Sequence, residues 1–267
     1  MQASAIEMIR KFRLDDKVSI VTGASRGIGL AMAESLAGAG SDLVIVGRKI
    51  ETLNPVAERI ASESGRQVLP IQADIGKLDE LDAIVDGAMN RFGKINVLVN
   101  NAGINARQPA EDYTEADWDA VTDVNLKGTF FITQACGKMM IQQKSGKIIN
   151  TLSLTSAVGL PTVVAYTAAK GGLMQLTRLL AVEWAVHNIQ VNGLAPGFIR
   201  TELTAAVRGD NRNQWALNRT PACRWGEPED LAGLTIFLAS EASDFVTGQV
   251  IFVDGGFMAG SDWRSNS

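Results

Sequence analysis

Short runs rich in β-branched residues alternate along this chain with longer segments whose apolar residues recur every three or four positions. This alternation is typical of a parallel sheet whose strands are joined by crossover helices. Most of the runs are apolar throughout, as expected of strands that helices cover on both faces. We expect strands at residues 18–21, 43–46, 68–72, 96–100, 147–152, 189–195 and 249–254.

No repeat, linker or low-complexity tract interrupts this rhythm in the 267 residues. The sequence therefore predicts one α/β domain over residues 1–267, a Rossmann fold with a doubly wound parallel sheet and helices on both faces. Residues 1–14 precede the first strand as an N-terminal extension. Polar and turn-forming residues gather at about 202–227, in "RGDNRNQ" and "TPACRWGEPED", and predict a mobile flap over the substrate.

Composition and charge exclude several classes of protein. A net charge of -4 with scattered Lys and Arg residues provides no basic surface for nucleic acid. No apolar run approaches the about 18 residues of a membrane span, and the first residues lack the apolar stretch of a signal peptide. Cys136, Cys223 and the single histidine, His187, cannot form a disulfide framework or a metal cluster. We expect a cytoplasmic protein without a bound metal.

The first strand runs into a helix through a glycine-rich turn, "TGASRGIG" at residues 22–29. Gly23, Gly27 and Gly29 allow the backbone to turn sharply and to approach a pyrophosphate, while the helix N-terminus offers free N–H groups. The first strand of an open parallel sheet ends beside the crevice where dinucleotides bind. The turn therefore favours a dinucleotide, and a tight connection without a ligand is the alternative.

The second strand ends at Gly47 and Arg48, where a protein that binds NAD carries a carboxylate for the ribose 2′-hydroxyl. Arg48 instead offers a charged fork that suits a 2′-phosphate, and Arg26 in the glycine turn is placed to contact the same phosphate. These residues favour NADP(H) over NAD(H). The alternative is a pair of solvated surface arginines.

Tyr166 and Lys170 lie four positions apart in "AYTAAKGG", so a helix places both on one face. A phenol titrates near pH ~10, and lowering its pKa to neutrality takes about 4 kcal/mol. A positive charge about 4 Å away contributes about 4 kcal/mol at an effective dielectric near 20. Lys170 is therefore sufficient to make Tyr166 a working acid, and an ordinary helix face is the alternative.

The motifs "TGASRGIG", "NNAG" at 100–103, "DVNLKG" at 123–128 and "YTAAK" at 166–170 follow one another in an order that resembles the short-chain dehydrogenase/reductase family over nearly the whole chain. The resemblance implies a seven-stranded sheet, a nicotinamide cofactor, and a homotetramer built partly on helices around 117–143 and 164–187. It also implies that the catalytic residues are Asn125, Ser153, Tyr166 and Lys170. In this set Ser153 donates to the substrate oxygen, and Asn125 holds a water that links Lys170 to solvent.

The resemblance further implies which residues contact the cofactor. They are Gly23, Ser25, Arg26, Gly27, Ile28, Gly29, Arg48, Asp74, Ile75, Asn101, Ala102, Gly103, Tyr166, Lys170, Pro196, Gly197, Ile199 and Thr201. Asp74 and Ile75 are expected near adenine, residues 101–103 beneath the cofactor, and residues 196–201 on the nicotinamide side.

Two longer stretches, "NAGINARQPAEDYTEADWDAV" and "RTPACRWGEPEDLAG", resemble the gluconate 5-dehydrogenase-like branch of the family, which implies a sugar acid such as gluconate or 5-ketogluconate as substrate. A carboxylate needs a fixed cation, and Arg107, Arg219 and Arg224 lie in segments expected to border the substrate mouth. Ser153 and Tyr166 are expected at the reacting oxygen. The alternatives are a broad-range carbonyl reductase, a 3-oxoacyl carrier-protein reductase, and a nicotinamide-binding regulator without enzymatic activity.

Overall fold

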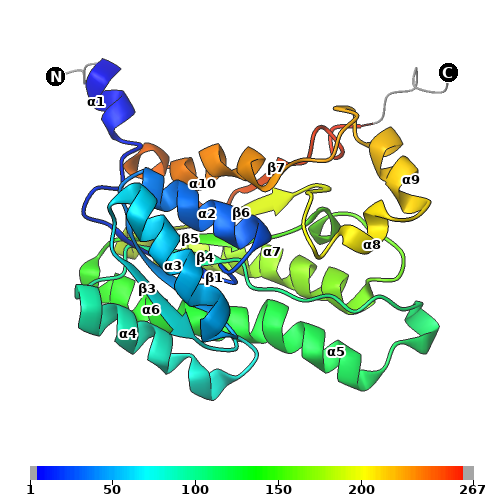
Figure 1. The fold of residues 1–267 in the computed structure, drawn as a ribbon, viewed down its shortest axis with the longest axis horizontal. Helices are drawn as coiled ribbons and strands as arrows, with labels where there is room; N and C mark the ends of the chain where they lie inside the picture. The colour runs from blue at the N-terminus through cyan, green and yellow to red at the C-terminus, as the bar shows by residue number, and fades with distance from the viewer. Residues whose placement is uncertain (1–4, 261–267) are drawn as a thin grey trace.

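The centre of the protein is a seven-stranded parallel sheet, seen in a computed structural model that describes residues 5–260 (Figure 1). The strand order is β3-β2-β1-β4-β5-β6-β7. The strands are β1 (Val18–Thr22), β2 (Asp42–Gly47), β3 (Val68–Gln72), β4 (Val97–Asn100), β5 (Gly146–Thr151), β6 (Ile189–Pro196) and β7 (Val250–Val253). All seven strands predicted from the sequence are therefore confirmed.

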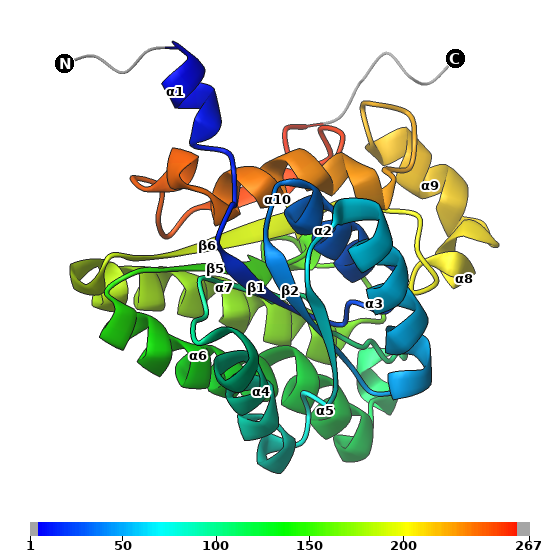
Figure 2. The ribbon, with the colours of Figure 1, turned by 60° about the vertical axis from the view of Figure 1, so that its left-hand side comes forward.

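Helices cover both faces of the sheet, which confirms the doubly wound fold. α2, α3 and α10 lie on one face, and α4, α5, α6 and α7 lie on the other (Figures 1 and 2). The helices are α1 (Ala5–Arg10), α2 (Gly27–Gly38), α3 (Ile50–Ser64), α4 (Asp82–Phe92), α5 (Glu115–Thr122), α6 (Thr129–Gln143), α7 (Val164–Trp184), α8 (Ala205–Arg208), α9 (Arg212–Arg219) and α10 (Ala232–Ala239).

Neighbouring residues of the central strand β1 explain why the strands are apolar throughout. Ile20 belongs to the hydrophobic cluster beneath α4 and α6, and Val21 belongs to the cluster beneath α2 and α10. Both side chains are fully buried. Since successive side chains of a strand point to opposite faces, a sheet with two covered faces needs an apolar residue at nearly every position.

The strand order reverses between β1 and β4, which lie side by side with Ile20 opposite Leu98. The chain proceeds from β1 outward to β3 and then returns to the other side of β1 for β4. The connections that follow β1 and β4 therefore lead to helices on opposite faces of the sheet, α2 and α5 (Figures 1 and 2). This divergence opens the crevice in which ligands of such folds bind.

The N-terminal extension leaves the body of the protein before Leu14. The side chain of Leu14 is fully buried, and its N–H donates to the carbonyl oxygen of Ala39 at 2.9 Å. α1 projects away from the body (Figure 1), and the side chains of Ile6 and Ile9 are each 70% exposed. Residues 1–4 of the predicted extension lie outside the described residues.

The segment predicted as a polar flap at about 202–227 contains α8 and α9, which the sequence pattern did not predict. Val207, Ala216 and Trp225 form a small buried cluster there, and Phe198 packs against it. The apolar residues of this segment are too sparse to show a helical period in the sequence. α8 and α9 are instead anchored by the contacts of Val207 and Ala216 with Trp225. Within the part of the chain that the structure describes, the helices lack the length and apolar character needed to cross a bilayer.

Candidate active site

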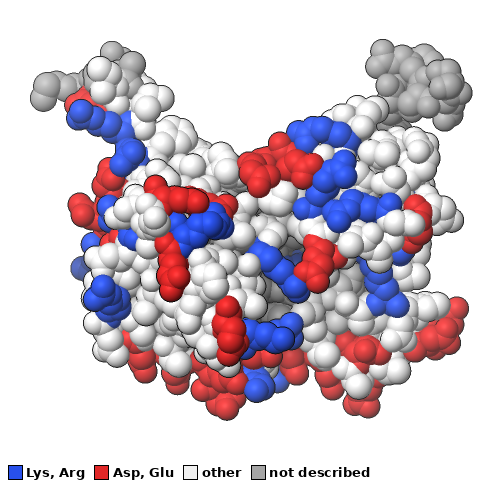
Figure 3. Space-filling view, viewed as in Figure 1, with Lys and Arg blue, Asp and Glu red and all other residues white. Residues whose placement is uncertain are grey.

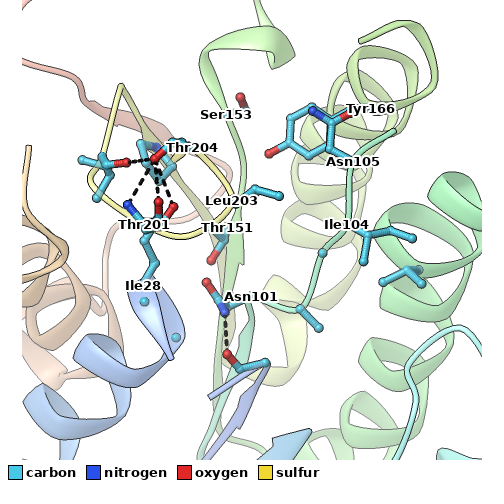
Figure 4. A pocket seen from close by; sticks show the side chains of 18 of the residues that line it. Ile28, Asn101, Ile104, Asn105, Thr151, Ser153, Tyr166, Thr201, Leu203 and Thr204 are labelled. Carbon is cyan, nitrogen blue, oxygen red and sulfur yellow. Dashed lines mark hydrogen bonds between the residues drawn. The ribbon is translucent and has the colours of Figure 1, made fainter. Parts of the chain in front are cut away.

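A cavity of about 560 Å³ opens at the carboxyl ends of the central strands, within the size range of small-molecule sites (Figure 4). Its lining contains all the site residues predicted from the sequence except four. The exceptions are Asp74, Asn125, Arg219 and Arg224. Among residues 5–260, groups of three or more His, Cys, Asp or Glu side chains placed to hold a metal ion are absent.

The glycine turn between β1 and α2 lies directly against the loop that follows β4. A Cβ atom on Gly23 would lie 2.9 Å from Cα of Ala102, and one on Gly29 would overlap the Gly23 carbonyl oxygen and the Asn101 side chain. α2 begins at Gly27 without a side-chain cap, so its first N–H groups remain available to an anion. This close backbone approach and the uncapped helix fit the pyrophosphate of a dinucleotide.

Two arginines flank the part of the cavity expected to receive the adenosine. Arg48 follows β2, is exposed, and forms no ion pair or hydrogen bond with any residue from 5 to 260. Arg26 forms an exposed ion pair with Glu202 of the flap segment. Figure 3 shows Lys and Arg side chains beside the hollow in the middle of this face, with acidic side chains next to them. This arrangement leaves Arg48 free to bind a phosphate, whereas Arg26 must exchange its partner to do so.

Asp74 does not line the cavity, although its neighbour Ile75 does. Asp74 Oδ1 accepts the N–H of Gly76 at 2.9 Å, and the Asp74 N–H donates to Glu80 Oε2 at 2.7 Å. The carboxylate thus stabilises the turn after β3. The contact with adenine expected for Asp74 has no support in this placement, because the turn directs its side chain to the backbone.

Asn125 lies in a π-helical turn, Asp123–Gly128, between α5 and α6, and its side chain is fully buried outside the cavity lining. Its Nδ2 donates to the carbonyl oxygens of Ile104 at 2.7 Å and Val121 at 3.0 Å, and its Oδ1 accepts the Ile104 N–H at 3.2 Å. Asn125 therefore fixes the loop after β4 beneath the cavity. Both amide protons are occupied, so Oδ1 is the only side-chain atom of Asn125 that can still bind a water.

Ser153 and Tyr166 face the same end of the cavity from different elements (Figure 4). Ser153 follows β5, where its Oγ accepts the N–H of Thr155 at 3.2 Å. Tyr166 and Lys170 stand one turn apart on α7, as the sequence predicted. The buried Lys170 ammonium donates to the carbonyl oxygen of Thr151 at 2.6 Å. This bond fixes Lys170 beneath Tyr166 at the end of β5.

The electrostatics of Tyr166 differ from the expectation based on Lys170 alone. Burial raises the pKa of Tyr166, whereas a hydrogen bond with Ser153 and the charge of Arg107 lower it. Lys170 Nζ lies 5.7 Å from the centre of the Tyr166 ring. Because the effect of burial is the larger one, the phenol keeps its proton at neutral pH, as a proton donor requires.

The segment after β6 closes the nicotinamide side of the cavity. Thr204 Oγ1 donates to the Ile199 carbonyl oxygen at 2.7 Å and accepts the Thr201 N–H at 3.1 Å (Figure 4). A Cβ atom on Gly197 would lie 2.6 Å from Cα of Asp254, so only glycine allows this segment to pass so close to the end of β7. Residues 196, 197, 199 and 201 all line the cavity, as predicted.

Arg107 is the one predicted substrate arginine that lines the cavity. It forms no ion pair or hydrogen bond with any residue from 5 to 260. Partial burial and the nearby charge of Arg212 lower its pKa, whereas Tyr166 and Asp210 raise it. An unpaired cation therefore lies within electrostatic reach of Tyr166.

The other two predicted substrate arginines have partners elsewhere. The Arg219 guanidinium lies over the ring of Phe257, 5.2 Å from its centre. Arg224 binds both carboxylate oxygens of Asp230, at 2.6 Å and 3.0 Å. Neither residue lines the cavity, because the fold of the flap directs both side chains to other parts of the protein. The prediction for these two arginines has no support in the structure.

Several lining residues were not predicted from the sequence. Asn105 and Thr155 contribute polar groups, and Leu160, Val163 and Leu203 contribute apolar ones. Asn105 and Thr155 follow the predicted motifs at the ends of β4 and β5. Position at the carboxyl end of a central strand was therefore the available signal.

Comparison with known proteins shows similarity along almost the entire chain. A family model described as enoyl-(acyl carrier protein) reductase matches residues 23–258. The 2-dehydro-3-deoxy-D-gluconate 5-dehydrogenase of Escherichia coli K12 is 46% identical over 254 residues, which cover 94% of this chain and 99% of that protein. The gluconate 5-dehydrogenase of Gluconobacter oxydans is 42% identical over 251 residues, which cover 92% of this chain and 96% of that protein.

A solved structure agrees with this similarity. The crystal structure of a gluconate 5-dehydrogenase from Burkholderia cenocepacia in complex with NADP and tartrate superposes with a TM-score of 0.91 at 43% identity. The match covers 94% of this chain and 98% of that one.

The buried Lys170 predicts a pH dependence of stability. Burial lowers the pKa of Lys170 from 10.5 to about 8. Between these values the unfolded chain holds a proton that the folded protein has released, so stability rises with pH in this window. Relative to a Lys170→Met variant, the free energy of unfolding of the wild type should increase by about 3 kcal/mol from pH 8 to 10.5. Urea unfolding of both proteins measures this difference, and parallel curves would contradict the prediction.

Proposed function

The chain belongs to the short-chain dehydrogenase/reductase family as an NAD(P)-dependent enzyme that acts on CH–OH groups, and we propose that it interconverts the hydroxyl and ketone forms of a sugar acid with NADP(H). The observation that carries the proposal is the cavity that joins Ser153, Tyr166 and Lys170 to the unpaired guanidinium of Arg107. A substrate with a carbonyl at one end and a carboxylate at the other matches this pair of features. The relatives named for gluconate and 2-dehydro-3-deoxy-D-gluconate support the same substrate class.

The residues of the cavity suit carbonyl reduction. NADPH supplies the hydride when it is bound. Ser153 Oγ accepts the Thr155 N–H, so its own proton, which bonds Tyr166 in the free site, can turn to the carbonyl oxygen of a bound substrate. Tyr166 keeps its proton at neutral pH and gives it to the oxygen as negative charge develops there. Oxidation of the alcohol follows the reverse course.

Lys170 and Asn125 support this proton transfer in the proposed mechanism. The lowered pKa of Lys170, about 8, lies close enough to neutrality for the ammonium to return a proton toward Tyr166. One of its protons is occupied by the Thr151 carbonyl oxygen, which leaves two for the cofactor ribose and a water. Asn125 Oδ1 is the acceptor available for that water, and its other bonds fix the loop beneath the cofactor.

The flap and the surface helices support two further proposals. α8 and α9 close over the substrate as a flap, with Asp210 in the turn between them and Arg212 at the start of α9 both close to Arg107.

The outer faces of α5, α6 and α7 join subunits in a homotetramer. Support comes from exposed apolar side chains on and next to these helices, namely Trp118, Phe131, Leu179, Val182 and Val186.

A cytoplasmic location is also part of the proposal, and the unpaired thiols of Cys136 and Cys223 fit a reducing compartment. The cofactor contacts proposed for the residues of the cavity lining are those expected from the family resemblance, with Asp74 acting through the turn that holds Ile75.

The unpaired Arg48 predicts that kcat/KM is higher with NADPH than with NADH. The double substitution Gly47→Asp and Arg48→Gln should reverse this preference, with a loss of about ten-fold or more for NADPH. A Cβ atom at Gly47 would lie 3.3 Å from Cδ2 of the buried Leu53, so the Leu53 side chain must shift by a few tenths of an ångström to accept the change. Lys49→Gln is the matched control, because Lys49 is exposed and does not line the cavity. A wild type that prefers NADH would refute the cofactor proposal.

Replacing Tyr166 by Phe keeps the ring and removes the transferable proton. Turnover should fall by about 10² to 10⁴-fold, while the Kd for NADPH, measured by nicotinamide fluorescence, should stay within a few-fold of wild type. The other tyrosine provides the control: Tyr113→Phe removes only a bond to the Ala106 carbonyl oxygen outside the cavity. A Tyr166→Phe variant with most of the wild-type rate would show that another group donates the proton.

The substrate proposal predicts that Arg107 selects for a carboxylate. The wild type should reduce 5-ketogluconate with a kcat/KM about ten-fold or more above that for L-sorbose, its uncharged C1-alcohol counterpart. Arg107→Gln should abolish this preference, and Arg219→Gln should retain it, since Arg219 contacts Phe257 outside the cavity.

Two other outcomes of this comparison would favour a different substrate. Equal use of both ketones by the wild type would indicate a broad-range carbonyl reductase. A clear preference for an acetoacetyl thioester over either ketone would indicate a 3-oxoacyl carrier-protein reductase.

A further inference from the structure

Two polar side chains of the cavity lack the hydrogen bonds that buried polar groups normally form. Asn105 and Thr155 both line the cavity, and the side-chain oxygen of each is buried without a partner among residues 5–260. An unpaired buried polar atom is unfavourable and is rare in folded proteins. A ligand that supplies the missing hydrogen bonds explains both cases.

Other polar side chains along the cavity already have partners inside the protein. Asn101 Nδ2 donates to the Thr22 carbonyl oxygen, and Thr204 Oγ1 donates to the Ile199 carbonyl oxygen. These residues lie on the cofactor side of the cavity. Within the lining, the unpaired oxygens of Asn105 and Thr155 therefore lie at the substrate end, and the polar side chains named on the cofactor side are paired.

The positions of Asn105 and Thr155 relate them to the two ends of the substrate. Thr155 follows Ser153 closely in the chain, and its N–H donates to Ser153 Oγ at 3.2 Å. Asn105 is two residues before Arg107 in a loop without regular structure, and like Tyr166 it lines the cavity. Thr155 therefore lies beside Ser153, which receives the carbonyl in the proposed mechanism. Asn105 lies close in the chain to Arg107, which receives the carboxylate.

The remaining lining at this end is largely apolar, with Leu160, Val163 and Leu203. An apolar wall offers no hydrogen bonds to a substrate that carries several hydroxyls. Asn105 and Thr155 are therefore the available partners for hydroxyls between the reacting carbon and the carboxylate. An amide and a hydroxyl can each donate and accept, which matches the hydrogen bonding of an alcohol.

We propose that Asn105 and Thr155 bind the hydroxyl groups of the substrate chain, so that the enzyme selects polyhydroxylated acids over simple keto acids of the same length. The proposal rests on the proposed function and adds the residues that recognise the hydroxyls. A site built to hydrogen-bond hydroxyls rejects an analogue without them, because the polar groups of the protein then stay unpaired.

Four ketones separate the contribution of the hydroxyls from that of the carboxylate. 5-Ketogluconate carries both features, L-sorbose carries only the hydroxyls, 5-oxohexanoate only the carboxylate, and 2-hexanone neither. The wild type should show a kcat/KM for 5-ketogluconate at least about 100-fold above that for 5-oxohexanoate, since two hydrogen-bonding residues each contribute about ten-fold.

The near-isosteric variants Asn105→Leu and Thr155→Val test the two residues separately. Each should lower kcat/KM for 5-ketogluconate and L-sorbose by about ten-fold and leave that for 5-oxohexanoate and 2-hexanone unchanged. Thr167→Val is the matched control. Its hydroxyl is also buried and unpaired, but Thr167 does not line the cavity. This variant should retain the wild-type preference for hydroxylated ketones.

Equal losses with all four ketones would overturn the proposal, because they would mean that the substitutions only disturb the site. A wild type without preference for the hydroxylated ketones would overturn it as well. Preference for hydroxyls without preference for the carboxylate would support the role of Asn105 and Thr155 and refute the sugar-acid function. Preference for the carboxylate without preference for the hydroxyls would refute the role of Asn105 and Thr155 and leave the sugar-acid function in place.

Discussion

The site depends on the close contact between the β1–α2 turn and the loop that follows β4. The contact exists because Gly23 and Gly29 have no Cβ atoms, and the Asn101 side chain secures it through bonds to the carbonyl oxygens of Thr22 and Gly23. A larger residue at either glycine would separate turn and loop, and would move the N-terminus of α2 away from the crevice. The same loop continues through the segment that Asn125 holds, so the cofactor side and the substrate side share one support.

The sequence predicted all seven strands because burial on both faces gives the central strands a nearly continuous apolar pattern, and the partly buried edge strands β3 and β7 are also mostly apolar. It did not predict α8 and α9, since Val207 and Ala216 are isolated apolar residues in a polar segment and their burial depends on Trp225. Asn is unfavourable inside a helix unless its side chain forms a bond elsewhere, so the residue type alone indicates that Asn125 has a partner. Its bonds to Ile104 were not predictable, because the two residues lie 21 positions apart and meet only after the sheet has formed.

In the site, as in the fold, motifs predict which residues come together, whereas the contacts of the individual side chains become visible only in the folded structure. The order of the motifs was sufficient to predict that Ser153, Tyr166 and Lys170 share one cavity with the glycine turn. For Asp74 the motif identified the turn after β3, and only the structure shows that its carboxylate bonds the Gly76 N–H within that turn. Arg219 and Arg224 are chemically equivalent to Arg107 in the sequence, and only the folded flap gives them other partners. The unpaired oxygens of Asn105 and Thr155 were beyond prediction, because a missing hydrogen bond becomes visible only when all neighbours are known.

In the proposed mechanism, the charge of Arg107 links the binding of an acidic substrate to proton transfer at Tyr166. In the free site this charge opposes the effect of burial and lowers the pKa of the phenol. A substrate carboxylate that pairs with Arg107 neutralises much of the charge, so the phenol holds its proton more firmly once the acid is bound. Lys170 is then the other cation near the phenol, 5.7 Å from the centre of the Tyr166 ring and fixed on the Thr151 carbonyl oxygen at the end of β5. An acidic substrate therefore removes most of the charge that lowers the pKa of Tyr166 in the free site, whereas a neutral ketone leaves that charge in place.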